Sequence, residues 1–203
     1  MADATGAGAP ASPFRGLALP ASAGVCAVTE TCATARHVLR ADPETAAALA
    51  GLAALPFPAA LNRIAAERER ALLVAMLGPD EWLVWATPDT AARVLQDLAR
   101  AKAAGHVFAL VDVSDRFCGM DLVGPAVEDV IASGCPLPLD PAGFPVGRVT
   151  RTVFHRTEII LARMDSASFR LECGRSFLPY VAHHLTAAVV AQTALLRHQS
   201  DPR

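Results

Sequence analysis

The sequence predicts an α+β domain with an antiparallel sheet, and two observations lead to this class. Short apolar segments occur in pairs, each separated by a turn and followed by a segment with the 3.6-residue period of a helix. After this strand–strand–helix unit has been repeated, three further strand candidates precede a last helix. Such an order favours antiparallel neighbours with helices packed on one face of a sheet. The 203 residues are enough for one domain with a substantial core.

Local signals place the individual elements. Strands are expected over residues 24–29, 71–77, 81–86, 107–113, 116–123, 148–154, 158–164 and 169–173. Helices are expected over residues 43–55, 88–104, 125–133 and 176–196. Asp42 and Thr87 each precede a proline, which is typical of an N-cap followed by the first helical residue. Apolar and polar residues alternate in segment 169–173, so we expect one face of that strand to contact water.

Composition sets the expected domain limits. Residues 1–20 are rich in Ala, Gly and Pro, and we expect them to form a flexible leader. Residues 21–198 contain no linker-like stretch, so a single domain is expected there. Residues 199–203 form a polar tail.

Charge and hydropathy exclude several classes of protein. Eighteen Lys and Arg residues stand against 20 Asp and Glu, which lacks the basic excess that nucleic-acid binding needs. Hydrophobic residues make up 53% of the chain, yet no uninterrupted apolar run reaches the roughly 18 residues of a membrane span. Five irregularly spaced cysteines, without a C-x-x-C pair, indicate reduced thiols. We therefore expect a cytoplasmic protein.

Two motifs resemble known sites but lack the context that their chemistry needs. Segment 6–11 matches the relaxed dinucleotide pattern G-x-G-x-x-A, but Pro10 and Pro13 prevent the helix that must follow it. His183 and His184 are adjacent in a predicted helix, where they point in different directions, whereas a chelating pair needs i, i+4 spacing. We expect one packed and one exposed histidine.

Each of two polar clusters can be interpreted either as structural or as functional. Asp112 could act as a general base whose pKa is set by Asp115 and Arg116, although turn capping is the favoured interpretation. Segment 174–177 joins the last strand to the last helix, where Ser176 is expected to cap the helix. The same segment could instead bind an anion or a partner's carboxylate, with help from Arg175.

Neither a G-x-S-x-G, a P-loop nor an H-E-x-x-H motif is present in the sequence. We therefore expect no catalytic, cofactor-binding or metal-binding residue in this chain. The expected contact residues lie in loops, or near them, on a rigid sheet. They are Trp82, Arg175, Ser176 and Phe177, together with the connector over residues 136–144.

A series of short motifs gives the sequence a resemblance to a known family. The motifs are Leu77-Gly-Pro-Asp-Glu-Trp-Leu83, Asp112-Val-Ser-Asp115, Leu122-Val-Gly-Pro125, Gly134-Cys135, Phe144-Pro145-Val-Gly147, Arg151-Thr152 and Arg175-Ser176-Phe177. In this order and spacing, over roughly residues 20–198, the chain resembles the gamma subunit of heterotetrameric sarcosine oxidase. It is also similar to the wider group built like the folate-binding T-protein of glycine cleavage.

The resemblance implies a subunit of a complex with alpha, beta, gamma and delta chains. That complex oxidatively demethylates sarcosine to glycine and produces hydrogen peroxide and, with tetrahydrofolate, methylenetetrahydrofolate. FAD, FMN, NAD and folate are implied for the larger chains and zinc for the delta chain, whereas the gamma chain carries no cofactor. Two alternatives stay open: a subunit of a related N-methyl amino acid dehydrogenase, such as one for N-methylglutamate, and a stand-alone folate-binding aminomethyltransferase.

Overall fold

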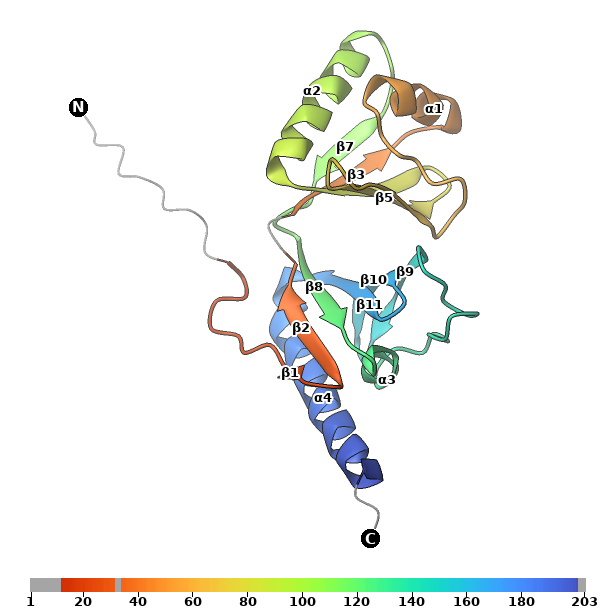
Figure 1. Cartoon of the computed structure of the whole chain (residues 1–203). Coiled ribbons are helices and arrows are strands. Elements are labelled where there is room, and N and C mark those ends of the chain that lie inside the picture. The colour runs from red at the N-terminus through yellow and green to blue at the C-terminus, as the bar shows by residue number, and fades with distance from the viewer. Residues whose placement is uncertain (1–11, 32–33, 201–203) are drawn as a thin grey trace, which may run out of the picture.

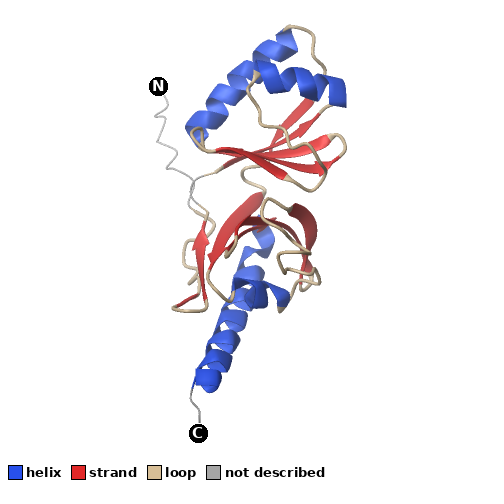
Figure 2. Cartoon of the chain, turned by 45° about the vertical axis from the view of Figure 1, so that its right-hand side comes forward, coloured by secondary structure: helices blue, strands red, loops and turns tan. Residues whose placement is uncertain are grey.

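Two antiparallel sheets lie face to face, and each carries helices on its outer side (Figure 2). The computed structural model describes residues 12–31 and 34–200. In chain order, the first strands belong to one sheet, the middle of the chain forms the other sheet, and the C-terminal part completes the first (Figure 1). The resulting layers are helices, sheet, sheet and helices.

We name the six-stranded sheet sheet 1 and the five-stranded sheet sheet 2. Sheet 1 has the order β1 (Ala21–Ser22), β2 (Cys26–Glu30), β8 (Phe117–Val123), β11 (Ser168–Gly174), β10 (Thr157–Asp165) and β9 (Val149–Phe154). Sheet 2 has the order β4 (Ile64–Glu67), β5 (Leu72–Gly78), β6 (Glu81–Ala86), β3 (Ala35–Arg40) and β7 (Ala109–Asp112). Helices α3 (Val127–Ala132) and α4 (Leu178–Ser200) cover sheet 1, whereas α1 (Pro43–Leu52) and α2 (Pro88–Ala103) cover sheet 2.

The α+β class is confirmed, but the strands divide between two sheets where the sequence predicted one. The chain passes from sheet 1 to sheet 2 between β2 and β3, and it returns between β7 and β8. At the edges β4 and β9 the sheets also meet directly. There the Ile64 N–H donates to the Gly147 carbonyl at 2.9 Å, and the Val149 N–H donates to the Asn62 carbonyl at 3.0 Å.

Local signals located most elements correctly. Asp42 caps α1 by accepting from the Thr45 N–H at 2.9 Å, and Thr87 accepts from the Thr90 N–H at the start of α2. No local pattern predicts β1, β3 or β4. Because β3 joins β6 to β7 in sheet 2, the second sheet cannot be recognised without it.

The described part of the expected leader packs onto the body of the protein. Phe14 is buried in the layer between sheet 1 and its helices, and Leu17 and Leu19 pack against that layer. Residues 1–11 and 201–203 lie outside the described residues. Residues 12–19 thus contribute to the core of sheet 1.

A thin apolar layer joins the two sheets. The buried residues of this layer are Ala75, Leu83, Trp85, Val113, Val149, Ile160 and Ala162. Ala75 and Ala162 are small, which allows close approach of the two backbones, and Trp85 is the largest side chain in the layer.

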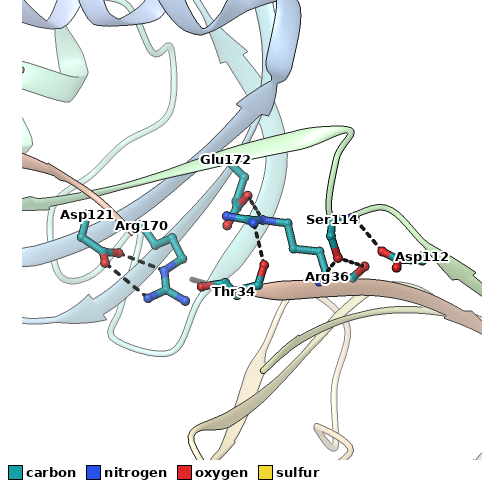
Figure 3. A network of polar contacts seen from close by, with 7 residues as sticks. All are labelled: Thr34, Arg36, Asp112, Ser114, Asp121, Arg170 and Glu172. Carbon is teal, nitrogen blue, oxygen red and sulfur yellow. Dashed lines mark hydrogen bonds and ion pairs between the residues drawn. The ribbon is translucent and has the colours of Figure 1, made fainter. Parts of the chain in front are cut away.

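A buried ion pair crosses this layer (Figure 3). The Nε of Arg36 on β3 donates to Oε2 of Glu172 on β11 at 2.6 Å, so the pair links sheet 2 to sheet 1. The Glu172 side chain is 1% exposed, and the prediction that the polar face of this strand contacts water is therefore wrong for Glu172. Burial raises the pKa of Glu172, and the charge of Arg36 opposes that shift.

Gly119 on β8 leaves the space in which this pair lies. A Cβ atom at Gly119 would come within 2.7 Å of both the Arg36 guanidinium and the Glu172 carboxylate. Any other residue would force these two charged groups to move. The neighbouring Arg170–Asp121 pair, with Nε to Oδ1 at 2.9 Å, lies toward the outside of the same network.

Removing one member of the buried pair should destabilise the protein strongly. We expect Arg36→Met and Glu172→Met each to lower the free energy of unfolding by about 3–5 kcal/mol, because the other charge stays buried without its partner. The double variant should lose much less than the sum of the two. Urea unfolding measures the cycle, and Arg100→Met, in the exposed pair with Asp97, is the matched control with a loss below about 1 kcal/mol. Additive losses would show that the two side chains do not interact.

Trp82 was expected to be a contact residue near a loop, but it belongs to the core of sheet 2. The hairpin ends at Glu81, so Trp82 lies inside β6 with its side chain toward the helices. It is 4% exposed and meets the ring of Phe57 edge-on, with centroids 5.1 Å apart. An indole in this position stabilises the chain itself.

We therefore expect Trp82→Ala to act on folding. The loss of the indole should lower the free energy of unfolding by about 3–5 kcal/mol, because the α1–α2 side of sheet 2 cannot refill the space. Leu61→Ala, at a half-exposed position, should change stability by less than about 0.5 kcal/mol. Chemical denaturation compares the two, and equal midpoints would contradict the packing described here.

Candidate functional site

The turn between β11 and α4 presents exposed side chains. Arg175–Phe177 forms a 3-10 turn that leads directly into α4. The Arg175 N–H donates to the Arg116 carbonyl at 2.9 Å, which fixes the turn against the start of β8. The ring of Phe177 is half exposed, and the Arg175 guanidinium reaches Asp115 at 3.6 Å in solvent.

Within the described residues, the Ser176 hydroxyl forms no hydrogen bond, and Gly174 is the residue at the N-cap position. The prediction that Ser176 caps the helix is thus wrong. Arg175, Ser176 and Phe177 instead line a shallow surface depression together with Asp115 and Arg116. The depression therefore combines an arginine with an exposed aromatic ring, two residue types that are enriched in protein interfaces.

Asp112 has the structural role that the sequence favoured. Its Oδ1 accepts from the Ser114 N–H at 2.9 Å. Hydrogen bonds from the side chain and backbone of Ser114 lower the pKa of Asp112, and the carboxylate faces solvent. A carboxylate with a lowered pKa is a weaker base, so this geometry favours a turn cap over a general base.

Glu81, next to Trp82, is a second carboxylate that connects the two sheets. It accepts from Arg40 of β3 at 2.6 Å and from Arg151 of β9, so it bonds to both sheets. Burial opposes ionisation of Glu81, but hydrogen bonds from Arg151 and Arg40 and their charges outweigh it and hold the pKa below its ordinary range. This carboxylate therefore has a structural role, in which it links the two sheets.

The connector over residues 136–144 folds onto the core around Arg163 of β10. The buried guanidinium donates to the carbonyls of Leu139 at 2.8 Å and Phe144 at 3.1 Å, and it pairs with Glu128 at 2.5 Å. Leu139 and Phe144 are themselves buried. Sequence reasoning missed Arg163, whose only local signal is a charged residue inside an otherwise apolar strand.

The cysteines within the described residues are buried in the core. Cys26, Cys118, Cys135 and Cys173 are free and buried, whereas Cys32 lies outside the described residues. Burial raises the pKa of Cys26 to about 11 and that of Cys173 to about 12, so their thiols stay protonated.

The histidine prediction is confirmed: His183 is exposed, and His184 packs between the rings of His155 and Tyr180 at 4.2 and 4.4 Å. Over residues 12–31 and 34–200, no group of three or more His, Cys, Asp or Glu residues is placed to hold a metal ion. The dinucleotide-like segment 6–11 lies outside the described residues.

Two hollows flank the apolar layer between the sheets. The larger, of about 640 Å³, is bordered by Trp85, Arg170 and Asp121, and the smaller, of about 310 Å³, is bordered by Glu81, Phe117 and β7. Arg170 pairs with Asp121 at the larger hollow, and Arg40 and Arg151 pair with Glu81 at the smaller one. In the described part of the chain, no helix is long and apolar enough to cross a membrane.

Comparison with known proteins gives one consistent family. The family described as "Sarcosine oxidase, gamma subunit family" matches residues 38–191. The chain is 32% identical over 171 residues to sarcosine oxidase subunit gamma of Corynebacterium sp. (strain U-96), which covers 82% of each chain. It is 27% identical over 175 residues to the subunit of the same name from Arthrobacter sp., covering 85% of this chain and 84% of that one.

Solved structures agree with this assignment. A chain of the heterotetrameric sarcosine oxidase from Corynebacterium sp. U-96 in complex with pyrrole 2-carboxylate matches with a TM-score of 0.78 and 28% identity, covering 90% of this chain and 95% of that one. The glycine cleavage system aminomethyltransferase T from Bartonella henselae shares the fold, with a TM-score of 0.58 and 15% identity over 80% of this chain and 45% of that one. The chain belongs to the sarcosine oxidase gamma subunit family.

Proposed function

We propose that this chain is the gamma subunit of a heterotetrameric sarcosine oxidase-type complex of the cytoplasm. The observation that carries the proposal is the match, over nearly the whole length of both chains, to one chain of a heterotetrameric sarcosine oxidase. The complex would oxidatively demethylate sarcosine to glycine, with formation of hydrogen peroxide and methylenetetrahydrofolate.

Within that complex, the gamma chain serves assembly, and its partners are the alpha, beta and delta subunits. The partner chains hold FAD, FMN, NAD, tetrahydrofolate and zinc. Glu81 and Glu172 form ion pairs that join the two sheets, which supports a structural role, because these carboxylates hold the sheets in position.

Assembly is the first property to measure. We expect co-expression with the other three chains to give a monodisperse complex that produces hydrogen peroxide from sarcosine, and we expect omission of this chain to reduce the yield of that complex. Size-exclusion chromatography and a peroxide assay provide the two readouts. A chain that stays monomeric beside its partners would contradict the proposal. A complex that oxidises N-methylglutamate in place of sarcosine would identify the related dehydrogenase.

The proposed assembly interface includes the turn Arg175–Phe177. Phe177 offers an exposed ring, and Arg175 extends into solvent beside it, so both are available to a partner. Aromatic rings and arginines of this kind contribute disproportionately to binding when a partner covers them. Trp82 does not belong to this interface, because the chain's own core covers it.

Substitutions in the turn should weaken assembly without unfolding the chain. We expect Phe177→Ala and Arg175→Glu each to raise the dissociation constant of the complex about 30-fold, equivalent to roughly 2 kcal/mol. Leu195→Ala, which removes a similarly exposed apolar side chain on α4, is the matched control and should change it less than about threefold. Surface plasmon resonance with unchanged thermal unfolding checks the prediction, and equal affinities for all variants would remove the turn from the interface.

A further inference from the structure

β7 is an edge strand whose outer side is open. It pairs with β3 alone, in the register Val38 with Val111 (Figure 1). The Val113 N–H donates to the Arg36 carbonyl at 2.9 Å, and this bond shows which residues of the segment have backbone groups that face β3. In an antiparallel pair the bonding direction alternates, so the backbone groups of Leu110 and Asp112 point away from β3. Within the described residues, no backbone hydrogen bond covers this outer side of β7.

A groove runs beside this edge. Val111 faces it together with its ladder partner Val38, and Phe117 and Ile160 form part of the opposite wall. The groove has a volume of about 310 Å³, enough for one or two apolar side chains. Val111 is 54% exposed, because sheet 1 does not extend over the inner face of β7.

The charged residues that line the groove are Arg40, Arg116, Arg151, Glu81 and Glu158, and Glu158 forms no ion pair within the described residues. Arg40 and Arg151 both bond to Glu81. Arg116 lies at the rim with its guanidinium 5.6 Å from the centroid of the Phe117 ring, and within the described residues no carboxylate pairs with it. It also borders the depression formed by Arg175–Phe177, so this side chain lies between the groove and the proposed interface.

The geometry points to strand addition: β7 receives an extended segment of another subunit of the complex, which places an apolar side chain in the groove and a carboxylate on Arg116. Open backbone groups beside a side-chain pocket are the features by which an exposed sheet edge recognises an extended peptide. The inference rests on the proposed function, because it takes the occupant from the partner subunits.

A second copy of this chain fits the site less well. In a symmetric pair of copies, each β7 would meet the β7 of the other copy. The carboxylate of that strand is Asp112, which already accepts from Ser114 and holds the turn. Arg116 therefore calls for an acidic residue from a different chain.

Hydrogen exchange on the assembled complex tests the backbone contact. The amides of Leu110 and Asp112 should exchange at least about tenfold more slowly in the complex than in the isolated chain, because a new strand would bond to them. The amide of Val111, which already faces β3, is the internal control and should change much less. Equal exchange of Leu110 and Asp112 in both states would overturn strand addition. Protection that rises with the concentration of the isolated chain would also overturn it, in favour of self-association.

Two variants test the side-chain contacts. Val111→Lys places a charge in the groove and Arg116→Glu reverses the rim charge, and each should weaken assembly at least about tenfold. Val190→Lys and Arg156→Glu are matched exposed controls on α4 and in the β9–β10 turn, and they should leave assembly within about twofold. If the complex forms with equal affinity for all four variants, the groove inference fails and the proposed function stands. If the unaltered chain forms no complex, the proposed function itself fails.

Discussion

The Arg36–Glu172 pair is the interaction on which the arrangement of the two sheets depends. Its members come from different sheets and are buried in the layer that joins them, so neither sheet can slide over the other without leaving a charge unpartnered. The desolvation of both groups makes such a pair a weak source of net stability. Its effect is geometric, since it permits only a narrow range of sheet positions. Gly119 completes this constraint by leaving room for the two charged groups.

The ion pairs of Glu81 connect the two sheets at a second point. They also help to explain why the inner face of β7 is uncovered. Arg151 of sheet 1 and Arg40 of sheet 2 meet on this one carboxylate. The Glu81 ion pairs and the Arg36–Glu172 pair hold the sheets in positions in which sheet 1 leaves the inner face of β7 uncovered. The apolar layer between the sheets is therefore continued at that edge by a groove. The position of the proposed partner site is in this way a consequence of the polar contacts between the sheets.

Sequence reasoning succeeded where the determinants are local and failed where they are distant. The N-caps at Asp42 and Thr87 and the strand β6 follow from neighbouring residues, and they were predicted correctly. β3 was missed because Arg36, His37 and Arg40 interrupt its apolar pattern, although two of these side chains are buried against other elements.

The site residues divide in the same way. Arg175 and Phe177 are exposed, as a turn before a helix indicates, whereas Trp82 is covered by Phe57 and by helices that are distant in sequence. The partner of Glu172 is 136 residues away, and no local pattern reveals such a contact. The alternation of apolar and polar residues indicates that β11 has a polar face. Glu172 on this face is buried because the second sheet packs against it.

The high apolar content of the chain has an internal explanation. A four-layer arrangement needs three separate apolar layers, and the buried residues do fall into three clusters. A composition of 53% hydrophobic residues is therefore no measure of interface area. The informative residues are the large apolar side chains that remain exposed beside a hollow. Val111 and Phe177 are two of them, and Arg116 borders the hollows beside both, so a partner that covers one is placed to cover the other.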